Sequence, residues 1–187
     1  MRVLAADPVS GLVFPITVLL AGAVVTGLLV PAINRRREAQ RKALEIRTGL
    51  VTEISDTVMG FVMSVQFAVL GAAGQSQEAY DQEYRSWETR SAVLGTKLDA
   101  YFPGTGLGRD WAAYAERVTA FYALTGVHDQ AERERGAAPL LAHYGRAWPD
   151  GPSDRAWIAA WGELKAAILE EKGVLIQRVL KTPMRGL

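Results

Sequence analysis

The sequence of residues 11–33 is GLVFPITVLLAGAVVTGLLVPAI, and Asn34-Arg35-Arg36-Arg37 follow it directly. These 23 residues contain no charged side chain. As an α-helix they would extend over about 35 Å, enough to cross a hydrocarbon core of about 30 Å. A cleaved signal peptide would have a shorter apolar run and a small-residue cleavage site in place of the arginines. A core helix fits poorly, because the apolar residues cover all faces and leave none for the polar side of an amphipathic helix. We therefore predict a transmembrane helix over residues 11–33, preceded by a short extracytoplasmic tail of residues 1–10.

The charges on the two sides of this segment predict its orientation. The N-terminal side carries one basic side chain, that of Arg2. The other side carries six within residues 34–47: Arg35, Arg36, Arg37, Arg41, Lys42 and Arg47. Because Lys and Arg accumulate on the cytoplasmic side of a membrane helix, we expect a single-pass protein of the cell membrane, with its N-terminus outside and residues 34–187 in the cytoplasm.

Residues 57–77 are also uncharged, which leaves a second topology open. Gly60, Ser64, Gln66 and Gly71 interrupt this stretch and make it a weaker insertion signal than residues 11–33. We favour a central helix of a bundle here. The alternative, a second membrane crossing, would return the C-terminal domain to the outside.

After the predicted anchor, apolar residues recur at steps of three and four almost throughout, which is typical of amphipathic helices. We predict an all-α domain over residues 34–187, a bundle of about four main helices at 35–73, 78–102, 110–125 and 153–182. The second of these helices has a seam at heptad spacing, formed by Tyr80, Tyr84, Trp87, Ser91, Leu94, Leu98 and Tyr101. The last has an apolar stripe formed by Trp157, Ile158, Trp161, Leu164, Ile168, Leu175, Ile176 and Val179.

Turn and capping signals set the expected connections. Residues 103–108 are Pro-Gly-Thr-Gly-Leu-Gly, which predicts a connecting loop, and Asp110 is placed to cap the third helix. Residues 127–152 are the least regular part, with a short apolar turn expected from Pro139 to Tyr144.

The sequence contains no recognisable set of catalytic residues. The absence of cysteine excludes disulfides, thiolate metal sites and a cysteine nucleophile. The two histidines, His128 and His143, lack the Glu-x-x-His spacing of metal sites in bundles. With a net charge of +1 and no basic face interleaved with aromatic residues, we expect no cofactor and no nucleic-acid partner.

Three groups of residues are candidates for binding. The basic cluster Arg35, Arg36, Arg37, Arg41 and Lys42 is expected to bind anionic lipid headgroups. The small residues Gly22, Ala23, Thr26 and Gly27 would let another membrane helix approach closely. Four tryptophans, Trp87, Trp111, Trp157 and Trp161, are either core residues, which is the simpler interpretation, or the lining of a pocket for an apolar ligand.

Two hypotheses for the function follow. The first is a membrane-anchored helical interaction module, a subunit or regulator of a membrane-associated assembly, with a protein partner or a second copy of itself. The second is a membrane-tethered sensor or carrier that binds an apolar ligand in an aromatic-lined bundle. An enzyme is the least favoured class, because no catalytic set is present.

Overall fold

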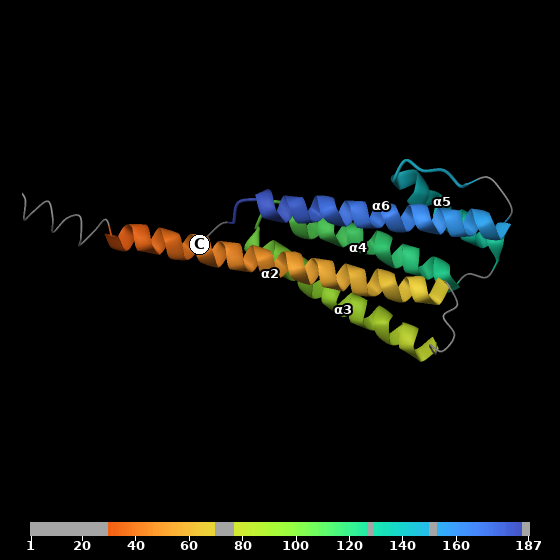
Figure 1. The fold of residues 1–187 in the computed structure, drawn as a ribbon, viewed down its shortest axis with the longest axis horizontal. Coiled ribbons are helices and arrows are strands. Elements are labelled where there is room, and N and C mark those ends of the chain that lie inside the picture. The colour runs from red at the N-terminus through yellow and green to blue at the C-terminus, as the bar shows by residue number, and fades with distance from the viewer. Residues whose placement is uncertain (1–29, 70–76, 127–128, 150–152, 185–187) are drawn as a thin grey trace, which may run out of the picture. The chain divides into compact units, whose positions relative to one another are not determined.

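The computed structural model describes residues 30–69, 77–126, 129–149 and 153–184. In these residues every regular element is a helix, in agreement with the predicted fold class (Figure 1). The elements are α2 (Val30–Val69), α3 (Gln77–Tyr101), α4 (Leu107–Ala123), the 3-10 turn η2 (Leu124–Gly126), α5 (Gln130–His143) and α6 (Ser153–Lys181). None of the described helices is both long and apolar enough to cross a membrane.

The described residues divide into two units, 30–45 and 46–184. The smaller unit is the first part of α2, in which no side chain is buried. It is rich in Ala, Arg and Glu, which have high intrinsic helix propensity. The larger unit contains the rest of α2 and all other helices.

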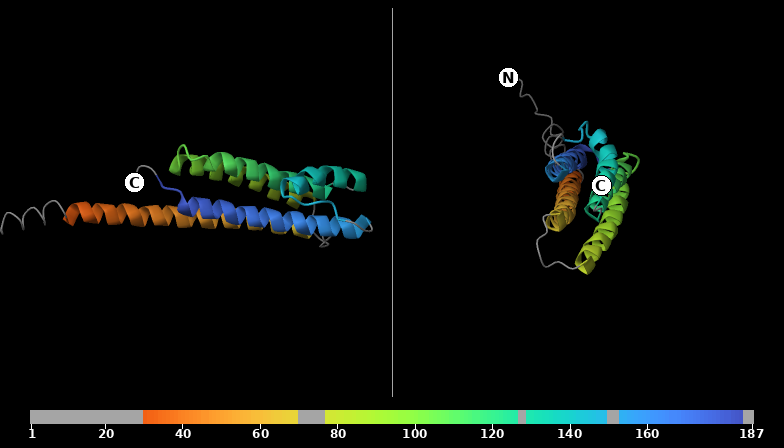
Figure 2. Two further views of the ribbon diagram at one scale, coloured as in Figure 1. Left: turned by 90° about the horizontal axis from the view of Figure 1, so that it is seen from above. Right: turned by 90° about the vertical axis from the view of Figure 1, so that its right-hand side faces the viewer.

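In the larger unit, four long helices run alternately up and down. Arg47 donates to the Thr182 carbonyl oxygen at 2.7 Å, and Lys165 donates to Gln66 Oε1 at 2.5 Å, so α2 and α6 are antiparallel neighbours. Lys97 on α3 binds Glu53 on α2 at 2.7 Å. Figure 2 (left) shows two layers, with α3 and α4 in one and α6 with residues 46–69 of α2 in the other. This is the arrangement of an up-and-down bundle.

Apolar side chains from all these helices fill the space between the layers. The largest fully buried side chains include Trp111, Tyr114, Phe102 and Phe121. The rings of Phe61 and Trp87 stack with centroids 4.7 Å apart, and those of Phe121 and Trp161 stack at 5.6 Å. The described part of residues 57–77 contributes Thr57, Val58, Phe61, Val62 and Val65 to this core.

The connection between α4 and α6 differs from the sequence prediction. In the described ranges the bundle has five helices, because residues expected to be irregular form α5, which packs against α6 and α4. The side chain of Asp129 caps α5 by accepting from the Glu132 backbone N–H at 2.9 Å. Pro139 lies inside α5 and is exposed. The predicted turn from Pro139 to Tyr144 was wrong, because this capped start outweighs the proline signal.

The start of α4 also differs from the prediction. The helix begins at Leu107, and its N-cap is Gly106, whose φ of 77° lies in the left-handed region that favours glycine. Asp110 is therefore in the first turn rather than at the cap, where it forms an ion pair with Arg178 of α6.

The predicted apolar stripes are confirmed in most positions and wrong in two. Trp87, Ser91, Leu94 and Leu98 are buried as the seam predicts. Tyr101 is 38% exposed, and Phe102 is buried in its place just after α3 ends. Ile158 on α6 is 58% exposed, because its neighbours Trp157 and Trp161 already cover the face that packs inward.

Candidate functional site

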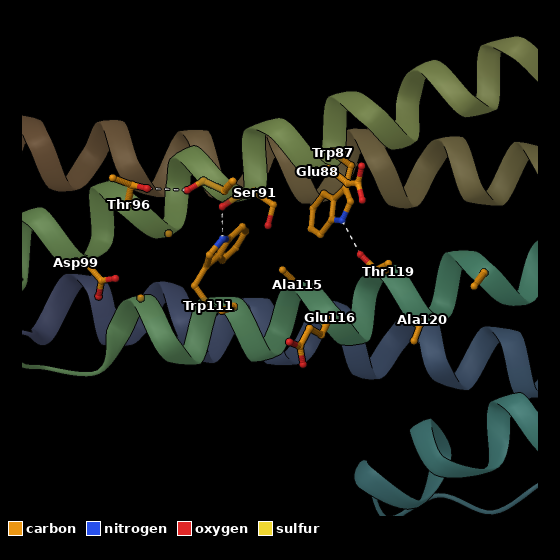
Figure 3. A pocket seen from close by; sticks show the side chains of 15 residues that line it. Trp87, Glu88, Ser91, Thr96, Asp99, Trp111, Ala115, Glu116, Thr119 and Ala120 are labelled. Carbon is orange, nitrogen blue, oxygen red and sulfur yellow. Dashed lines mark hydrogen bonds between the residues drawn. The ribbon is translucent and has the colours of Figure 1, made fainter.

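A groove of about 690 Å³ runs along the outer side of the layer formed by α3 and α4 (Figure 3). Its lining comes from these two helices and is mostly small: Ala92, Gly95, Gly108, Ala112, Ala115, Ala120 and Ala123. Four of these alanines (92, 112, 120 and 123) are exposed to solvent. Because a methyl group projects little from a helix, the two backbones lie close to the surface along the whole groove.

Two tryptophans form the floor of the groove and link its walls. Trp87 on α3 donates its indole N–H to Thr119 Oγ1 on α4 at 3.0 Å, and Trp111 on α4 donates to the Ser91 carbonyl oxygen on α3 at 2.8 Å. Figure 3 shows both bonds crossing between the helices. The two ring centroids are 6.2 Å apart. With both polar atoms satisfied, the floor is held in one arrangement.

Gly95 on α3 lies against the Trp111 indole of α4. A Cβ atom at Gly95 would lie 3.4 Å from Trp111 Cδ1, so the indole packs directly on the α3 backbone. An alanine would fit here, whereas a longer side chain at position 95 would compete with Trp111 for this space.

The charged side chains of the lining are all acidic. Glu88 and Glu116 stand on opposite walls, and Asp99 lies towards the other end (Figure 3). Among the described residues, none of the three lies within 4.0 Å of a Lys or Arg nitrogen. Glu88 hydrogen-bonds the hydroxyl of Tyr84, which raises the pKa of that tyrosine. The lining of the groove is therefore mostly apolar, and its charged side chains are all negative.

Asp99 has a structural partner at the start of α4. A Cβ atom built at Gly108 would lie 2.1 Å from Asp99 Oδ1, so the carboxylate occupies the space that the glycine leaves open. Position 108 is in the first turn of α4, where a negative charge is stabilised by the helix dipole.

A second polar cluster joins α4, α6 and the end of α5. Arg117 forms a two-bonded ion pair with Glu171, and the Tyr144 hydroxyl donates to Glu171 Oε2 at 2.7 Å. Burial, followed by this hydrogen bond, raises the pKa of Tyr144 above its ordinary value, and burial also raises the pKa of Tyr114. Because these partners satisfy one another, the cluster stabilises the bundle and offers no open position for a ligand.

The basic cluster predicted from the sequence lies on the first part of α2. All five side chains, Arg35, Arg36, Arg37, Arg41 and Lys42, are exposed on one continuous helix. Residues 11–29 of the predicted transmembrane helix, including Gly22, Ala23, Thr26 and Gly27, lie outside the described residues. Both the lipid-binding and the helix-packing roles stay predictions.

The four candidate tryptophans lie in three different environments. Trp87 and Trp111 meet at the floor of the groove. Trp161 stacks on Phe121, and Trp157 stacks on Trp148 with centroids 6.4 Å apart while the Arg133 guanidinium lies 5.1 Å above its ring. Neither Trp157 nor Trp161 is part of the groove lining. The structure therefore brings two of the four together.

The histidines do not define a site. His143 is exposed at the end of α5, with its ring edge against Tyr144, and His128 lies outside the described residues. Within the described part of the chain, no group of three or more His, Asp or Glu residues is arranged to hold a metal ion.

Sequence reasoning missed the groove itself. The signal was present as Ala92, Gly95 and Asp99 on α3 and as Ala112, Ala115 and Ala120 on α4, spaced by three, four or five residues. Steps of three and four lie on one face of a helix, but small residues give a much weaker periodic signal than the large apolar residues that mark the core. Comparison with protein-family models, with curated proteins and with solved structures found no match.

Proposed function

We propose that this protein is a membrane-anchored interaction module whose helical bundle binds a protein partner in the groove between α3 and α4. The observation that carries the proposal is the contrast between a core filled by stacked aromatic rings and an open surface trough lined by Ala and Gly. Exposed small side chains add little to the stability of the bundle. They do provide a surface that another protein can approach closely.

The alternative is a carrier of an apolar ligand. The aromatic residues that would line its binding site contact one another instead, as the Phe61–Trp87 and Tyr84–Tyr122 pairs do at 4.7 and 5.1 Å. This packing favours the interaction module. The mostly apolar groove lining is the feature that a carrier would use.

Purification of the full chain in mild detergent, followed by mass spectrometry of everything bound, tests the two functions against each other. The proposal expects a protein partner in stoichiometric amount. A co-purifying lipid or small molecule in the absence of a protein partner would favour the carrier, and a monomer that turned over a substrate would contradict both functions.

The anchoring part of the proposal needs its own test. The chain contains no cysteine, so single cysteines at Ser10 and at Thr89, which is exposed on α3, can be labelled selectively. An impermeant thiol reagent applied to intact cells should label position 10 and leave position 89 unlabelled. Position 89 must react after permeabilisation. Labelling of position 89 in intact cells would contradict the cytoplasmic placement of the bundle.

A further inference from the structure

We propose, building on the function above, that the groove takes a basic amphipathic helix of the partner protein, whose apolar face lies on the Ala and Gly lining while Lys or Arg side chains pair with Glu88, Glu116 and Asp99. The first argument is charge. The lining contains three carboxylates and no basic residue, although the chain as a whole has a net charge of +1. The negative charge that would attract a cation is therefore local to the groove and is not a property of the whole chain.

The same charges discriminate against other occupants. An anionic membrane surface or a nucleic acid would be repelled by the carboxylates on both walls. An uncharged apolar ligand cannot pair with Glu88 and Glu116. Removing these carboxylates from water without a cationic partner costs free energy. A second copy of this groove would bring like charges together. A basic protein segment avoids all three penalties.

The backbone geometry favours a helix over an extended strand. Both walls are α-helices, whose N–H and C=O groups are already paired within the helix. An added strand would find no backbone partners here, in contrast to the edge of a sheet. A helix needs none, and walls of Ala and Gly allow axes to approach to about 8 Å.

The positions of the carboxylates predict the length of the partner helix and the spacing of its basic residues. Glu88 and Glu116 lie on opposite walls of the groove, with Ala120 beyond Glu116, and Asp99 lies towards one end (Figure 3). Glu88 and Asp99 are eleven positions apart on α3, which corresponds to about 16 Å, or about three helical turns. The partner helix should therefore carry basic residues near both ends of a stretch of roughly three turns, separated by small or apolar residues.

Site-specific photo-crosslinking in the full-length, membrane-bound protein tests this inference. A small diazirine-bearing residue replaces Ala112 in the groove, and in a matched control it replaces Ala159, which is exposed on α6. The crosslinked partner peptide is then sequenced by mass spectrometry. We expect position 112 to capture a segment with helical periodicity and basic residues at the stated spacing, and position 159 to capture none of it.

Charge reversal provides the second measurement. The double variant Glu88→Lys with Glu116→Lys should lower the yield of the crosslink at position 112 by about tenfold or more. The control double variant Glu134→Lys with Glu170→Lys changes the net charge equally at exposed positions on α5 and α6, and should leave the yield unchanged. Raising the salt concentration should lower the yield in the unaltered protein.

The outcomes separate this inference from the proposed function. If a stoichiometric partner crosslinks at position 159 and not at position 112, the protein still has a protein partner, but the placement of that partner in the groove and the inference of a basic helix are both wrong. An acidic or non-helical captured segment, or a yield unaffected by Glu88→Lys with Glu116→Lys, would equally overturn it. If no protein is captured at either position, both proposals fail.

Discussion

The two faces of the α3–α4 layer have opposite compositions, although they belong to the same helices. The inner face carries large side chains that are almost fully buried, such as Leu94, Leu98, Tyr114 and Phe121. The outer face carries exposed alanines and a negative rim. Burial of the inner side chains supplies the hydrophobic stabilisation. The outer face therefore does not need large apolar side chains for the fold to be stable. Substitutions on the two faces should therefore separate stability from binding.

The largest effect on stability is expected from Trp111→Ala. The indole is 1% exposed and donates its N–H to the Ser91 carbonyl oxygen. Its removal should lower the free energy of unfolding by about 3–5 kcal/mol, because it leaves a large cavity and removes a buried hydrogen bond. Denaturant unfolding followed by circular dichroism would measure this. A loss below about 1 kcal/mol would show that the buried contact between α3 and α4 contributes little to the stability of the fold.

A smaller loss is expected from the polar cluster on the inner side of α4. Arg117→Ala removes the partner of Glu171, whose side chain is 22% exposed. This should cost about 1–3 kcal/mol, since a partly buried carboxylate loses its charged donor. Lys97→Ala breaks the more exposed pair with Glu53 and serves as the control, with an expected cost of about 0–1 kcal/mol. Equal losses in the two variants would contradict the structural role of the cluster.

A modest gain is expected from Gly162→Ala. Gly162 lies inside α6, and no atom of the described residues would come within 4 Å of an added Cβ. Alanine should raise the free energy of unfolding by about 0.5–1 kcal/mol, because it restricts the unfolded chain and has higher helix propensity. A decrease in the melting temperature would mean that this position is packed in a way the structure does not show.

The sequence predicts the long helices well because each carries an apolar stripe. The expected ranges 78–102 and 153–182 agree with α3 and α6 to within one residue at every end. The apolar period that makes a helix bury one face is directly visible in the residue order. The fifth helix was missed because α5 is short and weakly amphipathic, and Pro139 argued against it more strongly than the Asp129 cap argued for it.

The candidate site was predictable only in part. The sequence predicts Trp87 and Trp111 as candidate residues, but their contact depends on the register between α3 and α4, which the periodicity of neither helix encodes. The groove exists because the outer face of α3 and α4 lacks large side chains. A lack of large side chains produces no hydrophobic periodicity in the sequence. Exposed alanines become informative only when two helices place them side by side.

The smallest effect on stability should come from the outer face, where substitutions test whether the groove binds the partner. Ala112→Arg with Ala120→Arg fills the groove, and Ala159→Arg with Ala166→Arg places the same side chains at exposed positions on α6. Both double variants should unfold within about 0.5 kcal/mol of the unaltered protein. The decisive measurement is the amount of partner that each full-length variant retains in mild detergent. We expect a loss of about tenfold or more for the groove variant and none for the α6 variant; equal retention by both would show that the partner does not bind in the groove.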